Sequence, residues 1–431
     1  MESYIKPLTK RNPEPFSARI PGSKSYTNRA LLLGAQRMGT TEIVGALQSQ
    51  DTIYLGEALN QFGGLEVTKT ANSFLINRTA KVLQAPEKEL YFGGAGTPSR
   101  LMLSFAVSAQ GSSVITGNSR LCERPMRHLL QAFDRIGVKY ECLGSHGCLP
   151  VRVTGGPVET NVWPIDGSVS SQFVTSLLIF AAQQNGPTTV NVVDKLVSEP
   201  YIEMTLKMMQ DYGIKCEHKK LREFVIYPGQ VNKDKIIIEV DASGMSYFLA
   251  AAPLTNSRVR IPGISLNSAQ GDVGLARAFE KMGCRLETGD NHILLDGTDA
   301  VLSGIDIDME RMPDVVLTLA AIAWLAKTPT HITNIANLRV KECDRIHAAS
   351  AELQRLGVKV DEGPDNLKIY PAKSVKSCLI NTYDDHRVAM AFGLLKLLYD
   401  GIEIEEPECV SKSFPNFWQE LARFYDHHEM N

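Results

Sequence analysis

The chain has 431 residues, of which 44% are hydrophobic and 22% charged, as in soluble globular proteins of two to four domains. Lys and Arg number 45 against 48 Asp and Glu, and this balance argues against a general nucleic-acid binder. The longest apolar run, 317–326, is about half of a membrane span, and the start of the chain lacks the pattern of a leader. Eight cysteines without a CxxC pair indicate reduced thiols and a cytoplasmic protein.

Six copies of one pattern follow one another along the chain. Each copy is a small polar loop, about ten mostly apolar residues, a Gly or Pro turn and a β-branched strand. The copies cover 22–44, 94–116, 168–193, 241–264, 312–335 and 384–405. Equivalent positions are 73, 74, 72, 71 and 72 residues apart, at Lys24, Thr97, Ser171, Ser243, Asp314 and His386. This period is too long for a short solenoid repeat, so it predicts a small subdomain copied six times.

A second helical pattern lies between these copies. It is an amphipathic helix, a glycine C-cap and a strand of alternating character. Its glycines are 74, 76, 70 and 74 residues apart, at Gly63, Gly137, Gly213, Gly283 and Gly357. Together the two patterns predict a βαβαββ unit and an α/β protein throughout. The first helix of each unit is apolar on nearly all faces and is expected to be buried, whereas the second is expected to be outer.

The six expected buried helices all start with Ser, Thr, Asp or a neighbouring Gly. For any one helix, N-capping is the simpler explanation. Six such starts gathered in one place would form a surface that binds anions. Several have a Lys or Arg close by, which favours a ligand-binding role.

Three segments of the first half carry candidate anion-binding groups. Lys24, Ser25 and Arg29 follow a turn and suit a phosphate or carboxylate, although the segment is not a Walker loop. The glycines of 93–100 would let backbone N–H groups approach a ligand, but the dinucleotide fingerprint is incomplete. Arg124 precedes a proline, which favours extended backbone and an outward side chain.

Four further segments follow along the chain, and the densest charge lies in 337–345. Residues 168–173 suit hydroxyl recognition and N-capping equally well, and Asp314 suits either an N-cap or a base that accepts a hydroxyl proton. Residues 337–345 read either as a solvated helix face, with Lys341 and Arg345 one turn apart, or as a loop–helix edge. Residues 384–387 favour a helix-start anion site using His386 and Arg387 over a metal site.

Seven cations fall in loops or helix starts of the repeats: Lys24, Arg29, Arg124, Lys341, Arg345, Arg387 and Lys412. Their convergence on one cleft would imply a strongly anionic substrate, because the whole chain has a formal charge of −3. Such a cleft could stabilise phosphate or carboxylate groups without a metal.

These segments resemble the 5-enolpyruvylshikimate-3-phosphate synthase family. The matching blocks run in order from about residue 21 to about 425 and include PGSKSYTNRALLL, ERPM, SVSSQF, DASGMSYFLAAA, PDVVLTLA, RVKECDR, DDHRVAMAF and SKSFPNF. The resemblance implies the two-domain enolpyruvyltransferase fold, an inside-out α/β barrel of three βαβαββ repeats per domain with buried helices. It implies a C-terminal domain of 1–22 plus 239–431, an N-terminal domain of 23–238, and an active site in the cleft between them.

The resemblance also implies an activity: transfer of the enolpyruvyl group of phosphoenolpyruvate to the 5-hydroxyl of shikimate 3-phosphate, with release of phosphate. Asp314 would take the hydroxyl proton, Glu342 would move a proton at the methylene carbon, and Lys24 would lie between the substrates. No cofactor or metal is implied, and the family is mostly monomeric. The implied shikimate 3-phosphate ligands are Lys24, Ser25, Arg29, Ser170, Ser171, Gln172, Ser198, Tyr201, Asp314, Asn337 and Lys341. The implied phosphoenolpyruvate ligands are Lys24, Gly96, Arg124, Gln172, Arg345, His386, Arg387 and Lys412.

The chain departs from the usual family blocks at Gln50, Gly94, Pro98 with Ser99, Glu199 and Gly244. Three alternatives compete with this interpretation. A sister enzyme that uses UDP-N-acetylglucosamine shares the fold but lacks the SSQF and KE-x-DR blocks. An inactive scaffold would not need Asp314 and Glu342, and a Rossmann oxidoreductase would need the missing glycine fingerprint.

Overall fold

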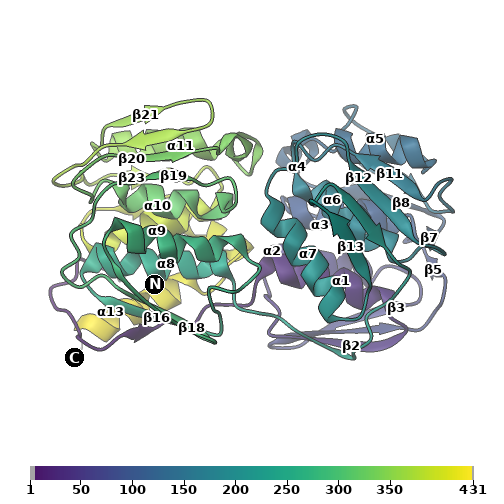
Figure 1. The fold of residues 1–431 in the computed structure, drawn as a ribbon, viewed down its shortest axis with the longest axis horizontal. Helices are drawn as coiled ribbons and strands as arrows, with labels where there is room; N and C mark the ends of the chain where they lie inside the picture. The colour runs from purple at the N-terminus through teal and green to yellow at the C-terminus, as the bar shows by residue number, and fades with distance from the viewer. Residues whose placement is uncertain (1–4, 430–431) are drawn as a thin grey trace. The chain divides into compact units, whose positions relative to one another are not determined.

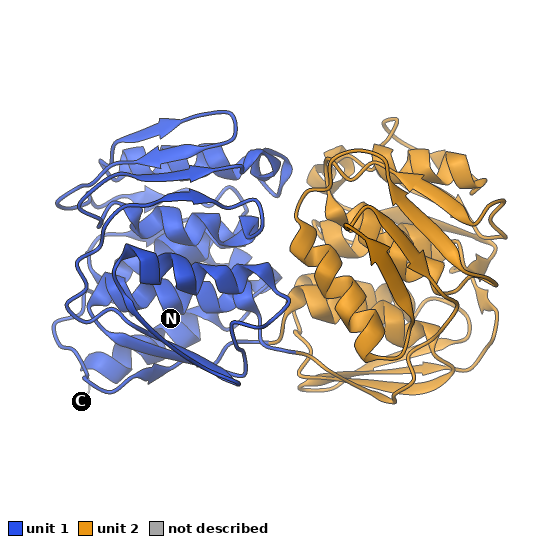
Figure 2. Cartoon of the chain, in the orientation of Figure 1, with its two compact units in different colours: residues 1–21, 239–431 blue, residues 22–238 orange. Residues whose placement is uncertain are grey.

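The computed structural model describes residues 5–429 and divides the chain into two compact units. Unit 1 runs to Pro21 and resumes at Glu239, and unit 2 is Gly22–Ile238 (Figure 2). The resemblance had placed Gly22 in the first of these. A Cβ on Gly22 would lie 1.9 Å from the backbone oxygen of Gly45 and 3.3 Å from Ile238, so this residue packs within unit 2.

Unit 2 contains three repeats, each with one four-stranded sheet (Figure 1). The first repeat consists of α1 (Lys24–Gln36), β2 (Gly39–Val44), α2 (Gln50–Leu59), β3 (Leu65–Lys69) and β4 (Ser73–Arg78). Its outer parallel strand is β15 (Lys235–Ile237), which comes from the far end of the unit, and the sheet order is β15-β2-β4-β3. The unit is therefore closed by its own last strand.

The other two repeats of unit 2 have the same sheet topology, and each takes all four strands from its own segment of the chain. The second consists of β6 (Leu90–Tyr91), α3 (Gly96–Ala106), β8 (Ser112–Thr116), α4 (Ser119–Glu123), α5 (Arg127–Ile136), β9 (Tyr140–Cys142) and β10 (Val151–Thr154), in the order β6-β8-β10-β9. The third consists of β11 (Val162–Ile165), α6 (Ser171–Ala181), β12 (Thr188–Val192), α7 (Glu199–Asp211), β13 (Cys216–Lys219) and β14 (Glu223–Ile226), in the order β11-β12-β14-β13. A small parallel pair, β5 (Leu83–Gln84) and β7 (Ala109–Gln110), adds to the unit.

Unit 1 is built from repeats of the same kind as unit 2. Its first sheet, β1-β16-β18-β17, takes strand β1 (Phe16–Ser17) from the N-terminal segment, parallel to β16. The other elements of that repeat are α8 (Ala242–Thr255), β16 (Arg258–Pro262), the 3₁₀ helix η2 (Gly271–Val273), α9 (Gly274–Met282), β17 (Arg285–Gly289) and β18 (His292–Asp296). The next repeat has sheet order β19-β20-β22-β21 and consists of β19 (Asp306–Asp308), η3 (Pro313–Val315), α10 (Val316–Ala323), β20 (Thr330–Thr333), η4 (Ala336–Val340), α11 (Arg345–Arg355), β21 (Val360–Glu362) and β22 (Leu367–Ile369).

The sixth repeat is shorter than the others. Its sheet is one parallel pair, β23 (Leu379–Ile380) with β24 (Glu403–Ile404), around α12 (His386–Gly393) and η5 (Leu394–Leu397). In place of the second strand pair, the chain continues through η6 (Pro407–Lys412) into α13 (Phe417–Glu429). Phe424 of α13 packs edge-on against Phe16 of β1, so this helix covers the sheet that the N-terminal segment joins.

The predicted division into buried and outer helices is confirmed. Every residue of α10 is buried, as are nearly all residues of α6 and α8, whereas α5 buries one face only. Each unit has its own continuous apolar core around its three buried helices. The three buried helices of each unit thus form its interior, and within residues 5–429 each sheet is open, so no sheet closes into a barrel.

The predicted glycine C-caps are confirmed at four of the five positions. Gly137, Gly213, Gly283 and Gly357 all have positive φ at or just after the end of an outer helix. At the fifth position the positive φ of 95° belongs to Gly64 rather than Gly63. Helix α2 ends at Leu59, so the turn that follows it is longer than in the other copies.

Replacement of Gly283 should destabilise unit 1. Its φ is 122°, and a Cβ would lie 2.8 Å from the backbone oxygen of Val301. We expect G283A to lower the free energy of unfolding by about 1–3 kcal/mol. The matched control is G156A, whose Cβ would meet nothing within 4 Å. Urea unfolding that gives equal stability for the two variants would contradict the prediction.

Candidate active site

Three cations converge on Asp314 in unit 1. Its Oδ1 lies 3.1 Å from Arg345 Nη1 and 3.7 Å from Lys341 Nζ, and its Oδ2 lies 2.9 Å from Arg387 Nη2. The N-cap of α10 is Val315, without a side-chain cap bond, so the N-cap interpretation of Asp314 is wrong. The carboxylate instead faces the three cations.

Arg345 joins three carboxylates although its side chain is only 2% exposed. Its Nη2 lies 3.0 Å from Glu342 Oε2, and its Nε lies 2.8 Å from Asp385 Oδ2. Burial alone would lower the pKa of this guanidinium, but the charges of Asp385, Glu342 and Asp314 together raise its pKa above the usual value. Arg345 is therefore charged at every physiological pH.

The segment 337–345 lies at a loop–helix edge, as one of the two interpretations predicted. Lys341 has extended backbone after η4, and α11 begins only at Arg345, so the two cations do not share a helix face. They meet at Asp314 because the chain turns between them. Glu342 lies in this turn and also pairs with Lys412 Nζ at 3.4 Å.

Asp385 is a site residue that the sequence analysis did not assign. It is fully buried, caps α12 by accepting the Arg387 N–H at 2.9 Å, and binds Arg345. The imidazole of His386 is also fully buried, with Nδ1 3.7 Å from Asp385 Oδ1. In this structure its imidazole therefore faces the protein interior.

A second missed residue is Asp272 of η2. The Ser243 hydroxyl donates a hydrogen bond to Asp272 Oδ2, and Arg387 Nη2 in turn lies 3.4 Å from Ser243 Oγ. Burial, reinforced by the charge of Asp314, raises the pKa of Asp272 to about 7. The sequence carried no signal for this residue, because η2 lies outside both repeated helix patterns.

Lys24 is the first of the predicted anion-binding residues of unit 2. It is the first residue of α1, and its Nζ lies 3.2 Å from the buried carboxylate of Asp51 in α2. Ser23 caps the helix by accepting the Tyr26 N–H. Asp51 carries no signal of this role in the sequence, because its approach to Lys24 depends on the packing of two helices.

Arg29 is a buried connector rather than an exposed cation. It is 1% exposed and donates to Thr205 Oγ1 at 2.8 Å, Tyr201 O at 3.0 Å and Ser25 O at 2.9 Å. It also donates to Thr175 Oγ1 at 3.3 Å, so it joins α1, α6 and α7. Burial lowers its pKa to about 10, which still leaves it charged at neutral pH.

The start of α6 has the N-capping role predicted for it, and recognition of a hydroxyl there stays a prediction. Ser170 accepts the Gln172 N–H and caps the helix, and Ser171 is its first residue. The side chain of Gln172 accepts a hydrogen bond from Arg100 Nη1 at 2.8 Å. Arg100 also lies over the ring of Phe173, with 5.0 Å to the centroid. The amide is thus oriented by the protein before any ligand arrives.

Two further positions in unit 2 have demanding local geometry. A Cβ on Gly96, the first residue of α3, would lie 2.5 Å from Arg124 Nη1, so only glycine lets this guanidinium rest on the helix start. Ser198, just before α7, has left-handed backbone with φ 54°. Such a conformation costs a non-glycine residue about 1 kcal/mol and is typical of functional positions. Asn337 lies in η4 of unit 1, four residues before Lys341.

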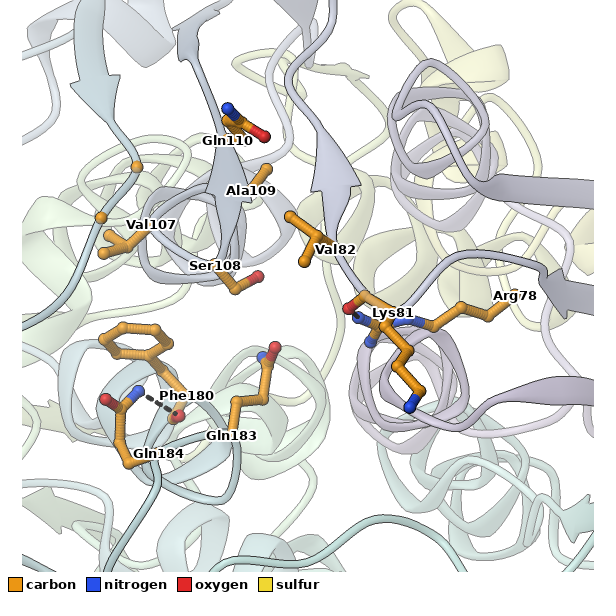
Figure 3. A pocket seen from close by; sticks show the side chains of 12 residues that line it. Arg78, Lys81, Val82, Val107, Ser108, Ala109, Gln110, Phe180, Gln183 and Gln184 are labelled. Atoms are coloured by element: carbon orange, nitrogen blue, oxygen red, sulfur yellow. Dashed lines mark hydrogen bonds between the residues drawn. The ribbon is translucent and has the colours of Figure 1, made fainter.

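Unit 2 also has a hollow of about 410 Å³ that none of these residues lines. Figure 3 shows the side chains around it. It lies beside the C-terminal ends of α3 and α6 and is lined by Arg78, Ser108, Gln110, Phe180, Gln183 and Gln184 among others. Arg78 donates to the backbone oxygens of Ala35 and Gln36 at the end of α1, and Gln184 donates to Phe180 O. These polar groups cap helix ends, and no residue implied as a ligand lines the hollow.

Within residues 5–429, no group of three or more His, Cys, Asp and Glu side chains could hold a metal ion. Over the same residues, the helices are too short or too polar to cross a membrane.

Known proteins resemble this chain over almost its whole length. The family model of EPSP synthase (3-phosphoshikimate 1-carboxyvinyltransferase) matches residues 15–421. The 3-phosphoshikimate 1-carboxyvinyltransferase of Vibrio vulnificus (strain YJ016) is 38% identical over 98% of this chain and 99% of its own length. The protein of the same name from Sulfurovum sp. (strain NBC37-1) is 39% identical over 93% of this chain and 95% of its own length.

Two solved structures share the fold. EPSP synthase from Acinetobacter baumannii has a TM-score of 0.81 at 24% identity and covers 97% of each chain. The enolpyruvyl transferase NikO from Streptomyces tendae has a TM-score of 0.74 at 17% identity, over 97% of this chain and 96% of its own. These likenesses confirm the predicted two-domain fold.

The free energy of unfolding should depend on pH because the pKa of Asp272 is raised in the folded state. The folded chain holds a proton on this carboxyl up to about pH 7, whereas the unfolded chain releases it near about pH 4. The native state thus binds more protons in this window, and the contribution of Asp272 to stability falls as pH rises. We expect D272N to be more stable than the wild type at pH 8 by roughly 1–3 kcal/mol, and to lose this advantage below about pH 4.

Urea unfolding at several pH values measures this difference. The exposed Asp306 provides the control variant D306N, for which we expect no such pH-dependent gain. A stability difference between D272N and the wild type that stays constant from pH 4 to pH 8 would contradict the account of Asp272.

Proposed function

The chain belongs to the EPSP synthase family, and from this membership we propose that it transfers the enolpyruvyl group of phosphoenolpyruvate to the 5-hydroxyl of shikimate 3-phosphate. This reaction releases phosphate and is a step of the shikimate pathway towards chorismate and the aromatic amino acids. The observation that carries the proposal is the pairing of two carboxylates, Asp314 and Glu342, with four cations of unit 1.

The chemistry requires two proton transfers at different atoms. The 5-hydroxyl oxygen forms a bond to C2 of phosphoenolpyruvate while its proton passes to a base, and C3 gains a proton to become a methyl group. The resulting tetrahedral intermediate then loses a proton from C3 and expels phosphate from C2. We assign the hydroxyl proton to Asp314 and the C3 proton, in both directions, to Glu342.

The cations of unit 1 explain how these carboxylates become active. Lys341, Arg345 and Arg387 all face Asp314, so this carboxylate shares their positive charge. Substrate phosphates and carboxylates would share these cations and thereby raise the proton affinity of Asp314. Arg345, Arg387 and Lys412 are assigned to phosphoenolpyruvate, and Lys341 with Asn337 to shikimate 3-phosphate.

We assign the residues of unit 2 either to direct substrate contact or to positioning, according to their burial and hydrogen bonds. Direct ligands are Lys24, Ser25, Gly96, Arg124, Ser170, Ser171, Gln172, Ser198 and Tyr201. Arg29 already donates to four protein oxygens, and we assign it the positioning of Ser25 and Tyr201 rather than a substrate contact. His386 of unit 1 is assigned the same kind of role beside Asp385, because its imidazole is fully buried.

We further propose that the enzyme acts as a monomer in the cytoplasm on free small molecules. The eight cysteines are unpaired in the structure, which fits a reducing compartment. The formal charge of −3 provides no general attraction for nucleic acid or acidic membranes.

Phosphate release from the purified, EDTA-treated protein tests the function. We expect release from phosphoenolpyruvate only when shikimate 3-phosphate is also present. Release with UDP-N-acetylglucosamine in its place would assign the chain to the sister activity. Absence of release with both acceptors would overturn the proposed reaction.

Removal of either carboxylate should stop turnover. We expect D314A and E342A to lower kcat by at least about 10²–10⁴-fold, because each removes a proton-transfer group. Substrate-induced tryptophan fluorescence should persist, which shows that the variants fold and bind. The control is E362Q, which alters a carboxylate paired with Arg339 outside the cluster. Near wild-type turnover in D314A or E342A would exclude the proposed role of that residue.

The contact between Gly96 and Arg124 should control the affinity for phosphoenolpyruvate. In G96A the new methyl group would displace the guanidinium, because the two would be 2.5 Å apart. We expect KM for phosphoenolpyruvate to rise about 10-fold, as for loss of a charged hydrogen bond, with little change in KM for shikimate 3-phosphate. G156A again provides the control, and an equal rise in both KM values would contradict the assignment.

A further inference from the structure

Three helix starts of unit 1 meet at one nitrogen atom. Arg387, in the first turn of α12, directs Nη2 to Asp314 Oδ2 at 2.9 Å and to Ser243 Oγ at 3.4 Å. Ser243 and Asp314 are equivalent positions of two successive repeats, and Arg387 follows the equivalent position of the third. The Ser243 hydroxyl is therefore placed to share the orientation of this guanidinium with Asp314.

The direction of the Ser243 hydroxyl is set by Asp272. The Ser243 O–H donates to Asp272 Oδ2, so a lone pair of Oγ remains for Arg387. The chain of contacts thus runs from Asp272 through Ser243 to Arg387 and Asp314.

Burial of the Asp272 carboxylate costs free energy that a purely structural residue at this position would not require. It is 5% exposed, and within residues 5–429 Ser243 is the one hydrogen-bond donor found for its carboxylate. Other buried carboxylates are better compensated: Asp385 binds Arg345 and the Arg387 N–H, and Glu352 accepts from Tyr383 and the Asn381 N–H. A buried carboxyl with so little compensation is typical of a functional position.

We propose that Asp272 and Ser243 form a positioning pair that holds the Arg387 guanidinium in place for phosphoenolpyruvate. This inference rests on the proposed function and adds to it two residues that make no substrate contact themselves. Neither residue moves a proton in the reaction. Their effect is on how well Arg387 is held before the substrate arrives, and this should appear mainly in affinity.

Single and double variants test the chain of contacts. S243A removes the contact to Arg387, and D272A removes the group that orients Ser243. We expect each to raise the Kd and KM for phosphoenolpyruvate about 3- to 10-fold, with KM for shikimate 3-phosphate and kcat within about twofold. The double variant should be no worse than either single variant, because both act through one hydroxyl.

Two further variants separate positioning from folding. D272N keeps an amide oxygen that accepts from Ser243 and should restore the wild-type affinity. T255V removes another buried hydroxyl of α8, which bonds to Ala251 O and Ser257 Oγ at the C-terminal end of the helix, and should leave both constants unchanged. Calorimetric binding of phosphoenolpyruvate in the absence of shikimate 3-phosphate gives a readout in which no transfer to an acceptor can occur.

The outcomes distinguish this inference from the function on which it rests. Unchanged affinity in S243A, additive effects in the double variant, or D272N as weak as D272A would each overturn the positioning pair. A wild-type protein that binds phosphoenolpyruvate, with the expected weakening in the variants, but releases no phosphate would overturn the proposed reaction alone. A wild-type protein that does not bind it would overturn both.

Discussion

The arrangement of unit 1 depends on one guanidinium. Arg345 is the first residue of α11, and its three nitrogens bind carboxylates at the start of α10, before α11 and at the start of α12. A cation that is 2% exposed must be compensated by anions, and each anion here is held by the helix or turn that carries it. The same ion pairs that make burial of Arg345 tolerable also place Asp314 and Glu342 on either side of it. Stability and chemistry therefore share one set of contacts.

Unit 2 also buries a guanidinium, that of Arg29, but its hydrogen-bond partners are neutral. Arg29 is buried among hydroxyl and backbone oxygens of three helices, and within the described part of the chain, 5–429, no carboxylate accepts a hydrogen bond from it. The positive charge is therefore retained rather than cancelled, which suits a unit assigned to anionic substrates. The two units thus differ in electrostatics although they share the repeat. Unit 1 joins its cations to several carboxylates, whereas unit 2 combines one such ion pair, Lys24 with Asp51, with hydroxyls and an amide at its helix starts.

The sequence predicted the periodic part of this structure. Hydrophobic pattern and glycine spacing indicated the βαβαββ unit and the division into buried and outer helices, because both depend on local burial. The shortened sixth repeat was missed, since its apolar helix α12 fits the pattern even though the later strands are absent. Asp272 and Asp51 were missed because their importance arises only when separate helices bring them to Ser243 and Lys24. The burial of Arg29 and His386 could not be predicted either. The sequence of a motif does not show whether its charged side chains face solvent or the core.

The central claim is that one buried guanidinium holds two carboxylates that move two different protons. The most direct test is to run the reaction in deuterated water and analyse the product by mass spectrometry. If Glu342 protonates C3 and later removes a proton, deuterium will enter the vinyl group of the product, because the intermediate methyl group contains protium and deuterium together. Transfer that proceeds fully without any deuterium in this group would contradict the account, since C3 would then never have been protonated.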